Sequence, residues 1–189
     1  MYHSDRPIDD LLSRLPAEGM ARLLALGQPA VFRRGEHLLH AGEPCRYLYK
    51  VERGILRTYR CWGGDPANEI TSGFSFPGDF DTSPSSFVMQ QPSVESIQAV
   101  LDAEVVCFGY EELTQLRRGD PAVGELILYA LADYMAATEQ VLFDMRVLSA
   151  RQRYDKLLAE HPDYVQQIPL KYLASFLNMK VETLSRVRR

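Results

Sequence analysis

Three residues near the C-terminus, Glu182, Ser185 and Arg186, have the types and the spacing that could read the edges of DNA bases. Arginine can bond both O6 and N7 of guanine, glutamate can accept a hydrogen bond from N4 of cytosine, and serine can bond either a base or a phosphate. The other candidates for DNA contact are cations and a hydroxyl, and such groups commonly bind phosphates, which position a protein without specifying sequence. They are Thr183, Arg188, Lys171 and Lys180. Arg189 is a further candidate for DNA contact and lies at helical spacing with Glu182, Ser185 and Arg186.

Each of these residues also has an ordinary structural interpretation. Glu182 could be an acid at the start of a helix, where it complements the helix dipole, and Arg186 could be a solvated surface charge. DNA recognition is favoured because the base-reading candidates fall on the side of a helix opposite Leu184 and Val187, which are expected to face a core.

The elements that must position these residues are two short helices joined by a tight turn. Small and apolar residues at helical spacing form one face of the first helix. Asn178 occupies the turn, where a left-handed backbone favours Gly or Asn. The pattern predicts a helix-turn-helix with helices over 170–177 and 181–189. The core face of the first helix consists of Leu173, Ala174 and Leu177.

The charge of the chain is uneven. Residues 146–189 contain nine Lys or Arg against four acids, a net charge of +5, whereas the other 145 residues carry 12 basic and 21 acidic groups, a net charge of −9. A basic end on a mildly acidic body suggests that this end meets an anionic partner. A basic surface that is merely solvated is the alternative that charge alone leaves open.

A long helix is predicted ahead of the two short ones. Asp120 has the residue type of an N-cap, Pro121 suits the first helical position, and no further proline occurs before Leu148. Apolar residues recur there at spacings of 4 and 3, interrupted once by Thr138, which is the heptad pattern of a helix–helix seam. About 28 residues give a helix of roughly 40 Å. The seam residues are Ile127, Leu131, Tyr134, Thr138, Val141, Met145 and Leu148.

The simplest use of this seam is pairing with the same helix of a second copy. An amphipathic helix that lies on its own domain is the alternative. After the long helix, a helix over 150–160 is expected to end at His161-Pro162, with a basic face that includes Arg151, Arg153 and Lys156. Residues 163–168 are expected to form a connector or a short strand.

The first part of the chain has a different texture. Residues 8–26 have the apolar spacing of short helices, interrupted near Pro16 and ended by Gly27. From Pro29 to about Tyr110, short β-rich runs alternate with glycine-marked turns, which is typical of a β-barrel or roll. The expected strands lie at or near 31–32, 37–40, 47–51, 55–62, 69–76, 94–100 and 105–108.

Composition excludes several classes of protein. The 189 residues are 46% apolar and 24% charged, as in soluble globular proteins. No stretch approaches the ~18 apolar residues that span a bilayer, and the polar N-terminus is unlike a secretory signal, so we expect a cytoplasmic protein without a membrane partner. The three cysteines are too few for an iron–sulfur cluster. No metal site, cofactor or enzymatic constellation is expected.

These motifs together resemble the Crp/Fnr family of transcription factors, and the resemblance covers almost the whole chain. It rests on Arg34-Gly35-Glu36, Ala41-Gly42-Glu43, Val51-Glu52-Arg53-Gly54, Pro77-Gly78-Asp79-Phe80 and Asp102-Ala103-Glu104-Val105 in the β region, and on the run from Ile168 to Met179 and Glu182-Thr183-Leu184-Ser185-Arg186 near the C-terminus. It implies an α+β architecture in three parts: a cyclic-nucleotide-binding-like β-roll sensor over 1–118, a dimerisation helix over 119–148, and a winged-helix-type helix-turn-helix over 149–189.

The resemblance also implies partners and residue roles. The family's base-reading Glu, Ser and Arg correspond to Glu182, Ser185 and Arg186. The implied partners are therefore double-stranded DNA with two-fold related half-sites resembling TTGA, a second copy of the chain, and RNA polymerase. The chain departs from the family pattern at Lys180-Val181, where Thr-Pro is frequent, and at Asn178, where Gly is usual. The hairpin that usually follows is not part of the sequence.

An effector pocket is implied in the β-roll. In relatives that bind cyclic AMP, an Arg-Ser or Arg-Thr pair holds the phosphate. Ser93-Val94 take that place here, and no Arg or Lys occurs between Arg60 and Arg117. Asp79 and Asp81 would also repel an anion. The residues that the resemblance places in the pocket are Gly78, Asp79, Phe80, Ser93, Val94 and Thr138, of which Thr138 could instead set the register of the seam.

The leading hypothesis is therefore a homodimeric, sequence-specific DNA-binding transcriptional regulator. Its β-roll would sense a small-molecule effector other than cyclic AMP, or would have lost ligand binding. The alternative is a cyclic-nucleotide-like ligand-binding module that acts through a protein partner rather than through DNA.

Overall fold

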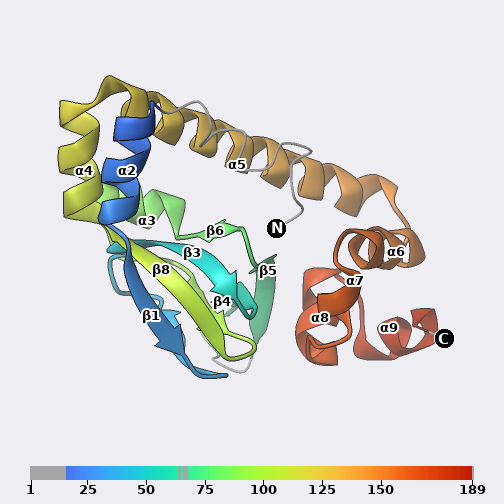
Figure 1. Ribbon diagram of the computed structural model, residues 1–189. Helices are drawn as coiled ribbons and strands as arrows, with labels where there is room; N and C mark the ends of the chain where they lie inside the picture. Colours follow the sequence, from blue (N-terminus) through green and yellow to red (C-terminus); the bar gives the residue numbers. More distant parts are fainter. Residues whose placement is uncertain (1–15, 64, 66–67, 189) are drawn as a thin grey trace.

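The computed structural model describes residues 16–63, 65 and 68–188. The part of the helical segment 8–26 that precedes Pro16 lies outside the described residues, and so does the DNA-contact candidate Arg189. Figure 1 shows a β-roll, a long helix that runs above it, and a group of short helices at the C-terminal end.

The β-roll confirms the expected series of short strands. It consists of two four-stranded antiparallel sheets, with strand orders β1-β8-β3-β6 and β2-β7-β4-β5. The strands are β1 (Gln28–Phe32), β2 (His37–Leu39), β3 (Tyr47–Arg53), β4 (Leu56–Cys61), β5 (Glu69–Ser75), β6 (Phe80–Asp81), β7 (Ser96–Ala99) and β8 (Ala103–Gly109).

Alternation along the strands fills the space between the two sheets. Tyr49 and Val51 on β3 and Val105 on β8 point inward and are buried, because successive side chains of a strand point to opposite faces. Between β3 and β4 the chain turns at Gly54, whose φ is 89°. A Cβ there would collide with the backbone oxygen of Asp102, so this turn requires glycine.

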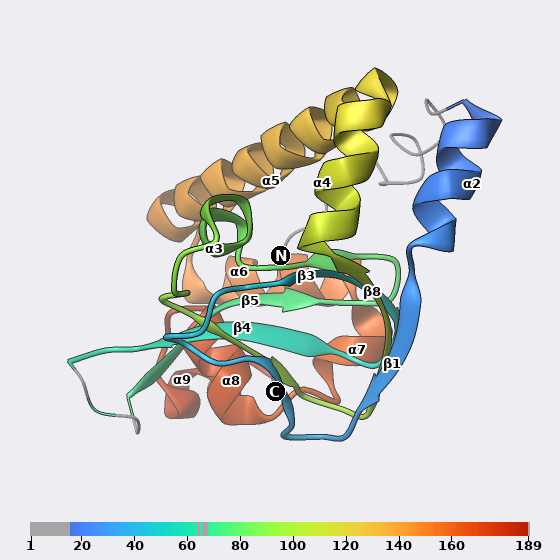
Figure 2. The same cartoon turned by 90° about the vertical axis from the view of Figure 1, so that its left-hand side faces the viewer.

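Short helices lie at one end of the roll. The helix α2 (Ala17–Ala25) confirms the described part of the N-terminal helical segment. The helices α3 (Pro84–Met89) and α4 (Tyr110–Gly119) are not predicted from the sequence. The reason is physical: α3 has six residues, too few to show a period, and α4 buries only Leu113. In Figure 2, α4 stands beside the start of the long helix.

The long helix α5 (Pro121–Val147) confirms the predicted helix. The side chain of Asp120 accepts a hydrogen bond from the N–H of Ala122 at 3.1 Å, and Pro121 is the first helical residue. Contrary to the expectation that no stretch could span a bilayer, α5 is long and apolar enough to cross a membrane, by length and composition alone. This is weak evidence, since a helix that pairs through an apolar stripe has a similar composition.

The C-terminal part consists of α6 (Ala150–Glu160), α7 (Pro162–Val165), α8 (Leu170–Phe176) and α9 (Val181–Val187). The bounds of α6 are those predicted from the sequence. The expectation of a connector or strand from residue 163 is wrong, because 162–165 form α7. Pro162 suits the first position of a helix, and burial of Val165 holds the turn in place.

A shared hydrophobic core joins the β-roll to the C-terminal helices. Phe74, Phe76 and Val100 of the roll pack with Leu157 of α6 and Leu173 of α8. Figures 1 and 2 both place α8 close to β5. The C-terminal helices are therefore docked on the roll by apolar burial, the dominant favourable term in folding.

Candidate nucleic-acid interface and sensor site

The turn between α8 and α9 has the expected geometry. Asn178 adopts a left-handed backbone with φ of 50°. The N–H of Asn178 donates to the carbonyl of Ser175 at 3.1 Å, and the N–H of Met179 donates to the carbonyl of Ala174 at 2.9 Å. These bonds satisfy the last carbonyls of α8. Burial of Leu173, Ala174, Leu177 and Leu184 completes a rigid corner between the two helices.

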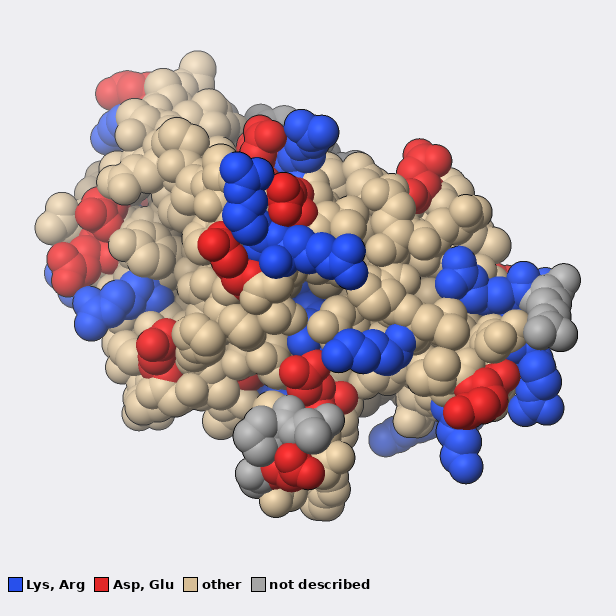
Figure 3. Space-filling view, turned by 90° about the horizontal axis from the view of Figure 1, so that it is seen from below, with Lys and Arg blue, Asp and Glu red and all other residues tan. Residues whose placement is uncertain are grey.

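The three base-reading candidates lie on the outer side of this corner. Glu182, Ser185 and Arg186 are exposed, whereas Leu184 is completely buried. Within the described residues, no hydrogen bond or ion pair engages these three side chains. Figure 3 shows several Lys and Arg side chains at the end of the molecule that α9 forms. The outer face of α9 is thus open to an external partner.

Arg153 ties this corner to the long helix. Arg153 is 8% exposed, so this member of the predicted basic face of α6 is buried. Nη1 donates to the carbonyl of Leu148 at 2.7 Å, and Nε donates to the carbonyl of Leu177 at 3.0 Å. One guanidinium therefore joins the end of α5 to the end of α8, where buried carbonyls need donors.

The other two cations of α6 are also engaged within the chain. Lys156 pairs with Asp144 of α5 at 2.6 Å, and Arg151 pairs with Asp155 at 2.9 Å. Arg151 also donates to the carbonyl of Val187 at 2.8 Å. Within residues 146–188, the basic residues that remain exposed without a carboxylate partner among the described residues are Arg146, Lys171, Lys180, Arg186 and Arg188. Thr183 is half-buried.

The exposed apolar stripe of α5 differs from the predicted seam. Ile127, Tyr134 and Val141 are half-buried against the rest of the chain. The most exposed apolar residues along the helix include Leu128 at 66%, Met135 at 62% and Leu142 at 56%. Leu128, Met135 and Leu142 are exposed at heptad spacing, and none of them is in the predicted seam; of the other predicted seam residues, Thr138 is exposed and Leu131 and Met145 are half-buried. Leu148, just past the helix, is half-buried.

A buried polar cluster occupies the side of the roll that faces α5. Asp81 is 7% exposed and accepts hydrogen bonds from Ser75 at 2.9 Å and from Thr58 at 3.3 Å. Burial raises the pKa of Asp81 to about 6. Glu95 is 6% exposed and accepts from Arg60 at 3.2 Å.

Tyr134 of α5 faces these two acids. Burial raises the pKa of its phenol, and the nearby charges of Glu95 and Asp81 raise it further. Both carboxylates accept hydrogen bonds from side chains of the chain itself. In the described part of the chain, the one arginine at the cluster is already paired with Glu95. The cluster therefore offers poor electrostatics for a phosphate.

The predicted pocket residues differ in burial and in their hydrogen-bond partners. The hydroxyl of Ser93 is buried and donates to the carbonyl of Glu95 at 2.7 Å, but Val94 is 61% exposed. Asp79 accepts from the N–H of Phe76 in the turn at Gly78. Thr138 donates to the carbonyl of Tyr134 at 2.8 Å and is exposed, so it belongs to the outward stripe. Phe80 is half-buried and packs in the core with Phe108.

Sequence reasoning missed most of the cluster. Thr58, Ser75, Ser83, Glu95 and Tyr134 are not among the predicted pocket residues, and Asp81 entered only as a repulsive charge. For Thr58, Ser75 and Asp81 the available signal was a polar residue in a strand, but burial of such a residue depends on elements distant in sequence. Among the described residues, no group of three or more His, Cys, Asp or Glu side chains is placed to hold a metal ion.

Comparisons with known proteins identify the roll and the overall fold. Residues 29–120 match the family profile of the cyclic nucleotide-binding domain. A search of curated protein sequences gives no match.

Solved structures of bacterial regulators have a similar fold. The structure of FixK2 from Bradyrhizobium japonicum superposes with a TM-score of 0.72 at 18% identity, covering 86% of this chain and 82% of that one. The catabolite activator protein of Thermus thermophilus gives 0.60 at 24% identity, covering 94% and 84%. The c-di-GMP-responsive global regulator CLP of Xanthomonas campestris gives 0.69 at 18% identity, covering 91% and 89%. The chain thus contains a cyclic-nucleotide-binding-type roll and shares its fold with these regulators.

Proposed function

We propose that this protein is a homodimeric transcriptional regulator that reads a two-fold symmetric DNA site with α9. The proposal rests on the outer face of α9, where Glu182, Ser185 and Arg186 are exposed and have no partner among the described residues, while Leu184 anchors the opposite side. Charged and hydroxyl groups left free on a rigid helix are suited to the major groove. Likeness of fold to known regulators over most of their length supports the assignment.

The test compares a palindromic TTGA-type duplex with a scrambled duplex of the same length. Arg186→Ala is expected to lower discrimination between them by about 1–3 kcal/mol, since one base-edge contact is lost. Arg118→Ala is the matched control, because Arg118 is exposed on α4. Equal weakening on both duplexes would show that Arg186 contacts only phosphate. Absence of wild-type binding at low salt would contradict DNA recognition altogether.

The second copy of the chain would pair along the outward stripe of α5. Leu128, Met135 and Leu142 are large apolar side chains exposed at heptad spacing, and pairing would remove them from water. Two recognition helices could then enter successive major grooves, which lie roughly 34 Å apart.

A charged residue introduced into the exposed stripe of α5 should separate the two copies without unfolding either one. Leu142→Asp is expected to convert the dimer to a monomer in sedimentation equilibrium, because a carboxylate would be buried in the seam. Leu24→Asp is the matched control: Leu24 is 57% exposed on α2, against 56% for Leu142. A wild-type protein that is monomeric at the concentrations used for DNA binding would rule out the dimer.

The roll would sense an effector that is neutral or cationic, or none, rather than cyclic AMP. Asp81 and Glu95 are buried beside the place where the phosphate would lie by family resemblance, and Arg60 is already paired with Glu95. As a regulator of this class the protein would act in the cytoplasm with RNA polymerase as a further partner, and without an enzymatic activity of its own.

The second candidate is a ligand-binding module that acts through a protein partner. The observation that favours it is the docking of α8 on the roll, which would allow the helices to serve only as a structural cap. Lack of DNA binding across all salt concentrations, combined with an intact dimer, would favour this candidate.

A further inference from the structure

The two-helix unit α8–α9 is attached to an exposed edge of the β-roll. β5 is the last strand of its sheet, so its outer backbone groups lack a strand partner. The N–H of Thr71 on β5 donates to Oγ of Ser175 on α8 at 3.0 Å, and the same hydroxyl lies 3.5 Å from the carbonyl oxygen of Glu69. A helix of the C-terminal part therefore takes the place of a neighbouring strand.

Arg57 of β4 lies at the centre of this attachment. Its side chain is 1% exposed, Nη2 donates to Glu69 at 2.7 Å, and Nε donates to Gln98 at 2.9 Å. Its Cζ lies 3.6 Å from the ring centroid of Tyr172 on α8 and 4.2 Å from that of Tyr59 on its own strand. A buried guanidinium thus contacts one aromatic ring from each side of the domain boundary, where cation–π attraction is strongest because water is excluded.

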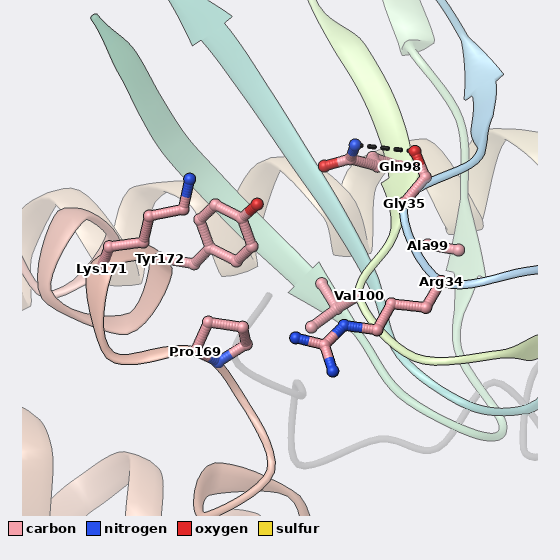
Figure 4. Close-up of a pocket in the computed structure, with 8 residues that line it drawn as sticks. All are labelled: Arg34, Gly35, Gln98, Ala99, Val100, Pro169, Lys171 and Tyr172. Carbon is pink, nitrogen blue, oxygen red and sulfur yellow. Dashed lines mark hydrogen bonds between the residues drawn. The ribbon is translucent and has the colours of Figure 1, made fainter. Parts of the chain in front are cut away.

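Aromatic contacts extend the attachment on one side, and a small pocket borders it on the other. Phe74 of β5 and Phe176 of α8 meet edge to face, with ring centroids 5.2 Å apart. The pocket has a volume of about 140 Å³. Figure 4 shows Lys171 and Tyr172 of α8 on one side of it and Gln98 and Arg34 of the roll on the other. Solvent reaches the boundary here, while Arg57 itself stays buried.

We propose that the contact of Arg57 with Tyr172 positions α9 for binding to two half-sites at once; this inference rests on the proposed function. The contact does not mask the recognition face, because Glu182, Ser185 and Arg186 stay exposed while α8 is docked. The corner at Asn178 makes α8 and α9 move together. Fixing α8 on the roll therefore fixes α9 relative to α5 and to the second copy, and helices that are ordered beforehand lose less entropy on binding.

The experiment measures binding to a duplex with two half-sites and to a duplex with one. Tyr172→Leu removes the ring from α8 and leaves the pair of Arg57 with Glu69 inside the roll. We expect affinity for the two-site duplex to fall about tenfold, as when only a tenth of the molecules keep the docked arrangement. Affinity for the single half-site should change less than twofold, since one helix needs no partner at a fixed distance.

Two further variants make the result specific to the contact. Arg57→Met should act in the same direction, and the double variant should be no worse than the more affected single one, because both substitutions break the same contact. Arg53→Met is the matched control: this arginine is exposed on β3, where it pairs with exposed Glu104 at 3.5 Å. It should leave both affinities unchanged.

Hydrogen exchange of the 69–75 segment reports docking without DNA. The Thr71 amide should lose protection in Tyr172→Leu and in Arg57→Met, but not in Arg53→Met. Equal loss of affinity on both duplexes would overturn the positioning role and leave Arg57 a merely stabilising residue. Tighter binding to both duplexes would also overturn it, because the contact would then mask α9. If the wild-type protein does not bind the two-site duplex, the proposed function is wrong, and this inference is wrong with it.

Discussion

The outer face of α9 and the interior of the β-roll are both rich in polar side chains, yet they suit opposite ligands. On α9, Arg186 and Ser185 are exposed and have no partner among the described residues. In the roll, Asp81 and Glu95 are buried and already hold hydrogen bonds from Ser75 and Arg60. Free exposed cations can meet phosphates, whereas buried satisfied acids repel them. Charge sign and burial, more than the fold, decide where an anion can bind.

The largest expected effect on stability comes from truncating Leu184, the buried residue that holds α9 against the core. Leu184 is completely buried, so Leu184→Ala should lower the free energy of unfolding by about 2–5 kcal/mol, through lost burial and an unfilled cavity. Urea denaturation measures the change. Val181→Ala on the same helix is the control, since Val181 is 39% exposed and should cost far less. A small effect at Leu184 would mean that α9 does not hold the outer face proposed to read DNA in a fixed position.

The next effect concerns the acid inside the roll. Burial raises the pKa of Asp81 to about 6, above the ~3.9 of an unfolded chain. Between these values the folded state holds more protons than the unfolded state, so stability falls as pH rises through this window. The loss of stability attributable to Asp81 is about 2 kcal/mol between pH 4 and pH 7.

Asp81→Asn should remove this component of the pH dependence in urea titrations at a series of pH values. The control is Asp102→Asn, because Asp102 is exposed and its pKa is lowered by hydrogen bonds from Arg34 and Arg33. That variant should keep the fall of stability toward pH 7. An unchanged slope in Asp81→Asn would show that the carboxyl is not desolvated.

The smallest expected effect is the response to cyclic AMP. Calorimetry should show no saturable binding below about 1 mM, because the buried acids oppose a phosphate and, in the described part of the chain, the arginine beside them is already paired with Glu95. Repeating the titration with Asp81→Asn and Glu95→Gln combined sharpens the comparison. A gain of binding would identify charge as the barrier. Tight binding of cyclic AMP by the wild type would show that the roll accepts an anion, contrary to the contrast drawn with α9.

Features decided by neighbouring residues were predictable. The cap at Asp120, the left-handed turn at Asn178 and the bounds of α6 depend on a few consecutive residues, and the structure confirms them. The strands of the roll follow from alternation and glycine turns. Short or mostly exposed helices such as α3, α4 and α7 were missed, since they show too little periodicity.

Features decided by contacts between distant segments were not predictable. Arg153 has the same local pattern as an exposed cation, but it is buried because two carbonyls from other elements need donors. The exposed stripe of α5 differs from the predicted seam because Ile127 and Val141 pack against residues of other elements and, like Tyr134, are half-buried. The buried cluster of Asp81 and Glu95 likewise requires strands that meet only in the folded chain.

The sequence by itself determined the order of the elements, the corner between α8 and α9, and the side of α9 that faces away from the core, because helical period and turn chemistry are local. Only the tertiary structure decided which cations are paired within the chain and which face of α5 is exposed. It also decided how α8 packs on the roll, through the hydrogen bond of Ser175 with β5 and the contact of Tyr172 with Arg57. Burial and pairing are properties of surfaces brought together from distant parts of the chain, and one residue's type and spacing do not contain them.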